Sequence, residues 1–244
     1  MKKTVLIVGG TSDIGHAVAR AYAEAGWTVV LAARDMAGAE RNAADLATRH
    51  QAEAEVRAVD ILDTAGFQPF IDGLPTLPDT VVSLVGLLAE QPKAQADAAY
   101  ASQVIRTNFE GPAVLLGMFA ERFEKRGAGL IVGVSSVAGD RGRASNYVYG
   151  SAKAGFSAFL SGLRNRLAGS GVRVVTIKPG YVRTRMTAGR ELPGLLTAEP
   201  EEVAASIFGC ETGRGDVIYV KRRWRAVMTV IRLIPERIFK HTRI

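Results

Sequence analysis

A tyrosine and a lysine four residues apart carry the clearest chemical signal in the chain. Tyr149 and Lys153 occur in the run Tyr-Gly-Ser-Ala-Lys, and Ser136 precedes the tyrosine by thirteen residues. Residues four apart share one face of a helix, so the phenol and the ammonium can lie side by side. A nearby cation favours the phenolate and lowers the pKa of the phenol from about 10 toward the range of an acid/base catalyst. With a hydroxyl from Ser136 on the same substrate oxygen, this set suits proton transfer to a carbonyl.

Short apolar runs alternate with longer helical patterns, which predicts the elements that position these residues. The expected strands are residues 5–8, 28–32, 56–59, 81–85, 130–134, 172–177 and 217–220. The expected helices are residues 14–25, 36–49, about 97–125, 147–168 and 200–209. Strands that are apolar along their whole length are buried on both faces, so the pattern predicts an α/β fold with a doubly wound parallel sheet. The segment 183–200 lacks periodicity and is expected to be a loop over a cleft.

The bulk composition favours one domain in a reducing compartment. A chain of 244 residues that is 48% hydrophobic can build one sizeable core. Its single cysteine, Cys210, excludes an internal disulfide framework and a thiolate metal cluster. The apolar run near the N-terminus is too short for a signal peptide, and no run reaches the roughly 20 residues of a spanning helix, so we expect a cytoplasmic protein. His16 and His50 have no partners at metal-ligand spacing, and no metal is expected.

A glycine-rich turn follows the first expected strand and leads into the first expected helix. It reads Gly9-Gly10-Thr11-Ser12-Asp13-Ile14-Gly15. Glycines let the backbone approach a diphosphate, and the amides and dipole of a helix N-terminus attract its charge. Such a turn is a weak signal by itself, but its place upstream of the tyrosine and lysine strengthens it. The sequence therefore predicts a dinucleotide site beside the acid/base residues.

From residue 4 to about residue 220 the chain resembles the short-chain dehydrogenase/reductase family, with its motifs in order and at the family's spacing. The resemblance implies a Rossmann fold, residues 1–220 as the dinucleotide-binding domain, and a separate basic tail over residues 221–244. It implies that the catalytic residues are Asn108, Ser136, Tyr149 and Lys153. The cofactor site that we expect comprises Gly9, Thr11, Ser12, Asp13, Ile14, Gly15, Arg34, Asp60, Ile61, Gly86, Tyr149, Lys153, Pro179, Gly180, Val182 and Thr184. Without Ser136 and Asn108, a half-buried core tyrosine and a solvated helical lysine would be the better interpretation of the pair.

The resemblance also assigns roles. Tyr149 would donate a proton to a substrate carbonyl while the cofactor delivers hydride, Lys153 would lower the pKa of the tyrosine and bind the nicotinamide ribose, and Ser136 would hydrogen-bond the developing alkoxide. Asn108 would fix a helix bend and organise a water that resupplies the proton. Tyr147 has no lysine four residues later and is expected to pack or to line the cleft.

The chain departs from the family pattern at two places. Asp13 replaces the middle glycine of the coenzyme loop, and we expect it to cap the first helix rather than to weaken cofactor binding. The usual Asn-Asn-Ala-Gly after the fourth strand is Ser-Leu-Val-Gly over residues 83–86, which changes the hydrogen bonds expected around the adenine ribose.

The choice of cofactor depends on the end of the second expected strand. A carboxylate at position 33 would bind the ribose 2′-hydroxyl and select NAD, but this position is Ala33. The next residue, Arg34, can pair with a 2′-phosphate, although arginines at strand ends are often simply solvated. The pattern predicts NADP(H) and makes NAD(H) the less favoured cofactor.

All the excess positive charge lies at the C-terminal end. The chain has a net charge of +7, and residues 214–244 hold nine Lys/Arg against Asp216 and Glu236, which accounts for the whole excess. Residues Trp224, Val227, Met228, Ile231 and Ile234 recur at helical spacing, with Arg222, Arg225, Thr229 and Arg232 on another face. A basic amphipathic helix fits the surface of an anionic membrane, but its apolar face could equally pack on the subunit or across an oligomer interface. Nucleic acid is not an expected partner, because no readout fold accompanies the charge.

Within the family, the variant glycine loop, the Ser-Leu-Val-Gly strand end and the basic tail resemble members that reduce decaprenylphosphoryl-2-keto-erythro-pentose, a lipid-linked sugar. We therefore expect an NADP(H)-dependent carbonyl reductase acting on a small-molecule or lipid-linked substrate, at the inner face of the membrane in the latter case. A soluble 3-oxoacyl-carrier-protein reductase and a non-catalytic NADP(H)-binding scaffold are the alternatives. The family resemblance also implies a homodimer or homotetramer.

Overall fold

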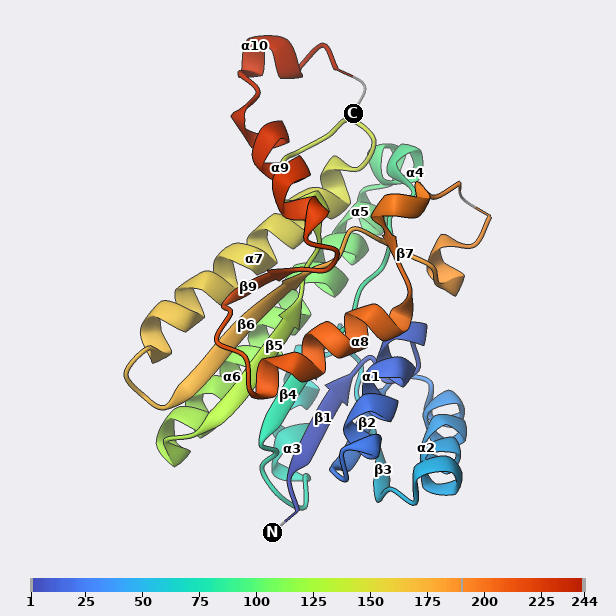
Figure 1. Cartoon of the computed structure of the whole chain (residues 1–244), viewed down its shortest axis with the longest axis vertical. Coiled ribbons are helices and arrows are strands. Elements are labelled where there is room, and N and C mark those ends of the chain that lie inside the picture. The colour runs from blue at the N-terminus through green and yellow to red at the C-terminus, as the bar shows by residue number, and fades with distance from the viewer. Residues whose placement is uncertain (1, 190, 243–244) are drawn as a thin grey trace.

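Seven parallel strands form the centre of the molecule. The computed structural model describes residues 2–189 and 191–242. Within them, one sheet has the strand order β3-β2-β1-β4-β5-β6-β9, and every neighbouring pair is parallel (Figure 1). Its strands are β1 (Thr4–Val8), β2 (Thr28–Ala33), β3 (Ala54–Ala58), β4 (Thr80–Ser83), β5 (Gly129–Val134), β6 (Val172–Lys178) and β9 (Val217–Tyr219). The order reverses between β1 and β4, which is the place where doubly wound sheets bind ligands.

Helices cover both faces of the sheet and bury two separate apolar clusters. The helices are α1 (Asp13–Glu24), α2 (Met36–His50), α3 (Phe67–Asp72), α4 (Gln91–Ala96), α5 (Ala98–Ile105), α6 (Gly111–Arg126), α7 (Tyr147–Leu167), α8 (Pro200–Phe208), α9 (Arg223–Leu233) and α10 (Glu236–Phe239). One cluster joins the sheet to α1, α2 and α8, and the other joins it to α3, α6 and α7. The predicted single-domain, doubly wound α/β fold is confirmed.

The expected strands are all present, and the differences lie in short or interrupted elements. The helix expected over residues 97–125 is broken by a π-helical segment, Arg106–Glu110, between α5 and α6. The short helices α3 and α4 have too few residues to show a period. The segment expected to be a loop after residue 183 is tied back by a two-stranded parallel ribbon, β7 (Tyr181–Val182) with β8 (Thr197–Ala198).

The basic C-terminal segment packs on its own subunit. Trp224, Met228 and Ile231 of α9 are buried with Phe239 of α10 and Val137 of the main body. These residues include the centre of the apolar face seen in the sequence, so that face is not free to contact a partner. The two helices stand at the end of the molecule where the strands have their carboxyl termini (Figure 1).

Two side chains, Trp224 and Arg141, anchor this segment to the main body of the protein. The indole Nε1 of Trp224 donates to the Leu196 carbonyl at 2.8 Å, and a Cβ at Gly180 would overlap the indole ring. The guanidinium of Arg141 donates to the Arg232 carbonyl at 3.1 Å and to Glu236 at 2.6 Å, and lies 4.1 Å from the Phe239 ring centroid. The C-terminal helices are therefore joined to the loop that follows β5.

Replacing Trp224 with alanine should destabilise the protein substantially, because it removes a buried indole and leaves a cavity against Gly180. We expect a loss of about 3–5 kcal/mol in the free energy of unfolding, measured by urea denaturation. Val230 on the same helix is 64% exposed, and Val230→Ala is the matched control, with a change within about 0.5 kcal/mol. Equal effects of the two substitutions would contradict the packing described here.

Candidate active site

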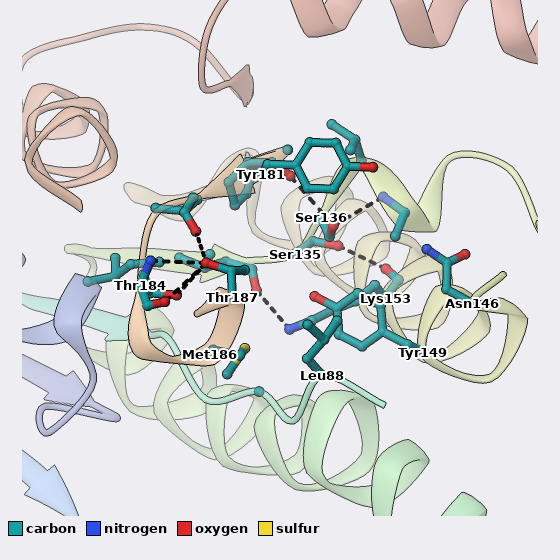
Figure 2. A pocket seen from close by; sticks show the side chains of 18 of the residues that line it. Leu88, Ser135, Ser136, Asn146, Tyr149, Lys153, Tyr181, Thr184, Met186 and Thr187 are labelled. Carbon is teal, nitrogen blue, oxygen red and sulfur yellow. Dashed lines mark hydrogen bonds between the residues drawn. The ribbon is translucent and has the colours of Figure 1, made fainter. Parts of the chain in front are cut away.

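A cavity of about 580 Å³ opens at the carboxyl ends of the strands, beside the reversal of strand order. Eleven of the residues predicted from the sequence line it: Ser12, Asp13, Ile14, Gly86, Ser136, Tyr149, Lys153, Pro179, Gly180, Val182 and Thr184. Figure 2 shows Thr184 and Thr187 on one side of this space and Ser136, Tyr149 and Lys153 on the other. The structure thus brings the predicted acid/base residues and most of the predicted cofactor residues to one place.

Ser136 and Tyr149 come together from the end of β5 and the first turn of α7. The Ser136 hydroxyl is buried, accepts a hydrogen bond from the Ala138 amide at 3.1 Å, and donates one to the Pro179 carbonyl at 3.5 Å. The serine caps the short turn Val137–Gly139, which fixes its side chain, and both Ser136 and Tyr149 line the same cavity. The two hydroxyls can therefore contact one substrate oxygen.

The Lys153 ammonium is buried beneath the tyrosine. Its Nζ donates to the carbonyls of Val134 at 3.2 Å and Val85 at 3.4 Å, at the ends of β5 and β4. It lies 5.9 Å from the Tyr149 ring centroid. Two backbone carbonyls therefore hold this cation at the centre of the site, and no carboxylate pairs with it among the ion pairs of the described residues.

Burial is the main cause of the pKa shifts of Tyr149 and Lys153. For Tyr149 it raises the pKa, whereas the sequence predicts that the nearby ammonium lowers it. Removal from water raises the pKa of Tyr149 to about 12, although the nearby Ser136 hydroxyl acts to lower it. Removal from water lowers the pKa of Lys153 to about 8. The expectation that the ammonium brings the pKa of the phenol into the neutral range is therefore wrong for this structure, because burial raises that pKa instead. The phenol holds its proton, as a proton donor must.

Asn108 is fully buried in the π-helical segment between α5 and α6. Its amide nitrogen donates to the carbonyls of Leu87 at 2.9 Å and Val104 at 2.8 Å, and its oxygen accepts from the Leu87 amide at 3.1 Å. Side chains inserted into the helical hydrogen-bond ladder bend helices, and π-helical turns often mark functional sites. The π-helical segment lies where the bend is predicted, and Asn108 ties it to the segment after β4.

The segment after β4 approaches the side chains of Asn108 and Lys153 closely. A Cβ at Gly86 would lie 3.0 Å from Asn108 Oδ1 and 3.4 Å from Lys153 Nζ. This explains why the glycine remains where the rest of the usual strand-end motif is replaced.

The glycine turn between β1 and α1 has Ser12, not Asp13, as its helix cap. The Ser12 hydroxyl accepts from the Gly15 amide at 3.0 Å and donates to the Gly9 carbonyl at 2.9 Å. Asp13 is the first residue of α1, and its carboxylate accepts hydrogen bonds from Arg185 instead. The prediction that Asp13 caps the helix is wrong, because the preceding serine already occupies that position.

The turn fits the diphosphate of a nicotinamide dinucleotide. Gly9 has a positive φ of 96°, and a Cβ at Gly15 would overlap the Gly9 carbonyl, so both positions require glycine. The cavity extends from this turn to Tyr149, and Pro179, Val182 and Thr184 line it where the nicotinamide end is expected. These residues would hold the cofactor, which supplies or accepts hydride when bound.

The remaining predicted cofactor residues lie outside the lining of the cavity. Gly9 and Gly15 shape the turn from behind it, and Thr11 lines a smaller neighbouring cavity. The predicted catalytic residue Asn108 also lies outside the lining. Arg34 and Asp60 are exposed at the ends of β2 and β3, and Ile61 is buried beside Gly111. Because Arg34 and Asp60 follow the two strands beyond β1, they mark the side of the site where an adenosine would extend.

Sequence reasoning missed several residues of the cleft wall. The cavity is also lined by Leu88, Asn146, Tyr181, Met186, Thr187 and Trp224. Most are apolar and come from loops or from the C-terminal helices, so no local periodicity or motif marks them. Asn146 stands three residues before the tyrosine, and its Oδ1 is buried without a hydrogen-bond partner.

Comparisons with known proteins agree with this geometry. A model of the short chain dehydrogenase family matches residues 3–192. An uncharacterized oxidoreductase of Mycobacterium tuberculosis is 37% identical over 239 residues, covering 97% of this chain and 95% of the relative. Sulfoacetaldehyde reductase 2 of Chromohalobacter salexigens is 36% identical over 195 residues, covering 78% and 77% of the two chains. A solved short-chain dehydrogenase from Sphingobium yanoikuyae in complex with NADPH has a TM-score of 0.81 and 27% identity, covering 93% of each chain.

The buried ammonium should make stability depend on pH. Because the folded chain lowers the pKa of Lys153 from 10.5 to about 8, the unfolded chain binds this proton more tightly between those values. Stability therefore rises with pH across that window. Relative to Lys153→Met, the wild-type free energy of unfolding should rise by up to about 3 kcal/mol between pH 7.5 and 10. Urea denaturation at a series of pH values measures the difference in the free energy of unfolding between wild type and Lys153→Met. If this difference did not change with pH, the ammonium would be well solvated.

Proposed function

This chain belongs to the short-chain dehydrogenase family of nicotinamide-dependent oxidoreductases, and we propose that it reduces a substrate carbonyl with NADPH. The observation that carries the proposal is the meeting of Ser136, Tyr149 and Lys153 on the wall of a cavity that reaches the glycine turn. The turn would hold the diphosphate of the cofactor, and the three side chains would surround the substrate oxygen that gains charge during reduction.

Each side chain has a role that follows from its surroundings. Tyr149 retains its proton because burial raises its pKa to about 12, so its hydroxyl is the proton donor to the substrate oxygen. Ser136 donates a second hydrogen bond to the same oxygen. As the tyrosine loses its proton, the phenolate is stabilised by the Lys153 cation beneath it. Asn108 positions the segment at Gly86 and Leu87 against the lysine, beside which a water that returns the proton would bind.

NADP(H) is the proposed cofactor. Ala33 offers no carboxylate to a ribose 2′-hydroxyl, and the exposed guanidinium of Arg34 stands at the end of β2, on the adenosine side of the turn. An arginine there can form a bidentate pair with a 2′-phosphate. The solved relative from Sphingobium yanoikuyae binds NADPH, which agrees with this choice.

The proposed substrate is a carbonyl compound with a large apolar part. Beyond the reacting group, the wall of the cavity is made by Leu88, Val137, Met186 and the rings of Tyr181 and Trp224. A lipid-linked ketosugar of the kind suggested by the variant loop and tail would place its sugar at Tyr149 and its lipid along these residues. A soluble 3-oxoacyl-carrier-protein reductase is the alternative, since an acyl chain meets the same apolar wall.

We also propose that the mouth of the cavity faces an anionic lipid surface. The apolar face of α9 predicted to meet a membrane is buried, but a second set of apolar side chains is exposed on the same end of the molecule. Leu233 is 76%, Ile238 60% and Leu195 74% exposed. Helices α9 and α10 also carry exposed arginines, among them Arg232 and Arg237 next to Leu233 and Ile238 in the chain, and each cation near an anionic bilayer contributes about 1 kcal/mol to binding. Among the described residues, no helix is both long enough and apolar enough to span a membrane.

Such a surface would hold the protein at the inner face of the cytoplasmic membrane, where a lipid-linked substrate is concentrated. A homodimer or homotetramer is proposed through α5 and α6, where Ile105 and Val114 are exposed.

Tyr149→Phe tests the reaction. Loss of the hydroxyl should lower kcat for reduction of a carbonyl substrate by a factor of about 10²–10⁴, because general acid catalysis contributes that much. NADPH binding, followed by fluorescence titration, should be retained. Tyr147→Phe changes an exposed tyrosine two residues away and is the matched control, which should keep nearly full activity. A screen of ketosugars, ketosteroids and oxoacyl thioesters supplies the substrate, and an active Tyr149→Phe enzyme would refute the assignment.

Co-sedimentation with vesicles tests the lipid surface. Wild-type protein should bind vesicles containing phosphatidylglycerol, bind much less to pure phosphatidylcholine, and be released by salt. The double substitution Leu233→Asp/Ile238→Asp should abolish binding, because it places charges where apolar side chains enter the lipid. Val217→Asp alters an exposed apolar residue on strand β9 and should leave binding unchanged. Equal binding to both kinds of vesicle, or none to either, would contradict the proposal.

A further inference from the structure

An ion pair joins the two walls of the cofactor cleft. Asp13, in the glycine turn, accepts hydrogen bonds from Arg185 Nε at 2.7 Å and from the Arg185 backbone amide at 2.7 Å. The same guanidinium donates from Nη2 to the Thr11 carbonyl at 2.9 Å. Arg185 therefore donates to three oxygen atoms of the turn, the two carboxylate oxygens of Asp13 and the Thr11 carbonyl oxygen. It lies 172 residues after Asp13 in the chain.

The Arg185 backbone is held in place by the threonines on either side. The Thr184 amide donates to Thr187 Oγ1 at 3.1 Å, and Thr187 Oγ1 donates to the Val182 carbonyl at 2.7 Å. This network closes the short helical turn Arg185–Thr187 directly after β7. Arg185 is thus presented to the glycine turn by a defined structure and not by a free loop.

The pair resolves an electrostatic problem posed by Asp13. The carboxylate stands at the N-terminus of α1, where the helix dipole attracts the diphosphate of a dinucleotide. A carboxylate beside a diphosphate is repelled by it, and the repulsion is strong at short distance where water is partly excluded. The Arg185 guanidinium offsets that charge through the hydrogen bond from Nε, and the Arg185 backbone amide satisfies the second carboxylate oxygen.

We propose that Arg185 is a cofactor-site residue that neutralises Asp13 and clamps the segment Thr184–Thr187 over the phosphate turn. Asp13 and Arg185 act as one unit: the arginine makes the acidic residue compatible with a bound diphosphate, and the carboxylate holds the arginine and its segment across the cleft. The proposal depends on nicotinamide dinucleotide binding, which belongs to the family, and does not depend on which carbonyl is reduced.

A double-mutant cycle tests the unit. Arg185→Ala, Asp13→Asn and the double variant are compared with wild type for NADPH binding by isothermal titration calorimetry, with NADH in parallel. Arg185→Ala should raise the Kd about tenfold, because it leaves an unpaired carboxylate beside the diphosphate. Asp13→Asn should bind close to wild type, and the double variant should recover most of the loss. The deficit of Arg185→Ala should shrink in high salt, where the repulsion is screened.

Arg183→Ala is the matched control. Arg183 is an exposed arginine two residues away that pairs with Glu199 at 3.0 Å and does not contact the turn. Its substitution should leave the Kd unchanged. In stopped-flow measurements, Asp13→Asn should both bind and release NADPH faster than wild type, which leaves its Kd close to that of wild type, because the clamp over the turn is lost.

Two results would overturn the proposal. If the double variant binds as weakly as Arg185→Ala, the arginine contacts the dinucleotide without regard to Asp13. If all three variants bind like wild type, the pair is a surface contact without influence on the cofactor. Because binding and not turnover is measured, either result leaves the assignment of Tyr149 intact. A chain that binds the dinucleotide but reduces no carbonyl would leave the clamp intact and refute the proposed reaction.

Discussion

The burial of one ammonium group organises the active site. Lys153 is almost completely enclosed, and its Nζ donates to carbonyls at the ends of β4 and β5. A charge in such a place is costly, and it persists because these two parallel strands end side by side and present their carbonyls to it. The segment after β4, which carries the Val85 carbonyl, is held by the hydrogen bonds between Asn108 and Leu87 and approaches the lysine closely at Gly86. The position of the Lys153 ammonium therefore depends on the sheet, through the strand ends, and on the π-helical segment between α5 and α6, through Asn108.

The second organising contact is between the C-terminal helices and the cleft. Trp224 lines the cavity, bonds to Leu196 on the segment opposite, and packs against Gly180 of the segment after β6. Arg141, shortly after Ser136, binds the same helices from the other side. The segment that looked like an independent appendage by its charge is a wall of the site, and its basic residues lie on the outer face.

How much of this could be predicted from the sequence differs between the sheet and the site. The strands and their order follow from continuous apolar runs and from the family motifs, and the catalytic residues follow from the spacing of Ser136, Tyr149 and Lys153. The pKa of Tyr149 could not be predicted, because it depends on how much water the fold removes from the phenol. The pairing of Asp13 with Arg185 could not be predicted either, since it joins residues far apart in the chain. A serine directly before Asp13 was, however, a visible signal that another residue caps α1.

The contact of Gly180 with Trp224 has a consequence for any attempt to redesign the enzyme. No side chain larger than hydrogen fits at position 180 while the indole is in place, so these two positions can change only together. A chimaera that carries the C-terminal segment of another family member in place of residues 221–244 would need a residue at position 180 that fits the new segment. Without such a residue, a gap would remain beside Gly180, in the segment after β6. The C-terminal helices and the segment after β6 must therefore be exchanged together in any chimaera.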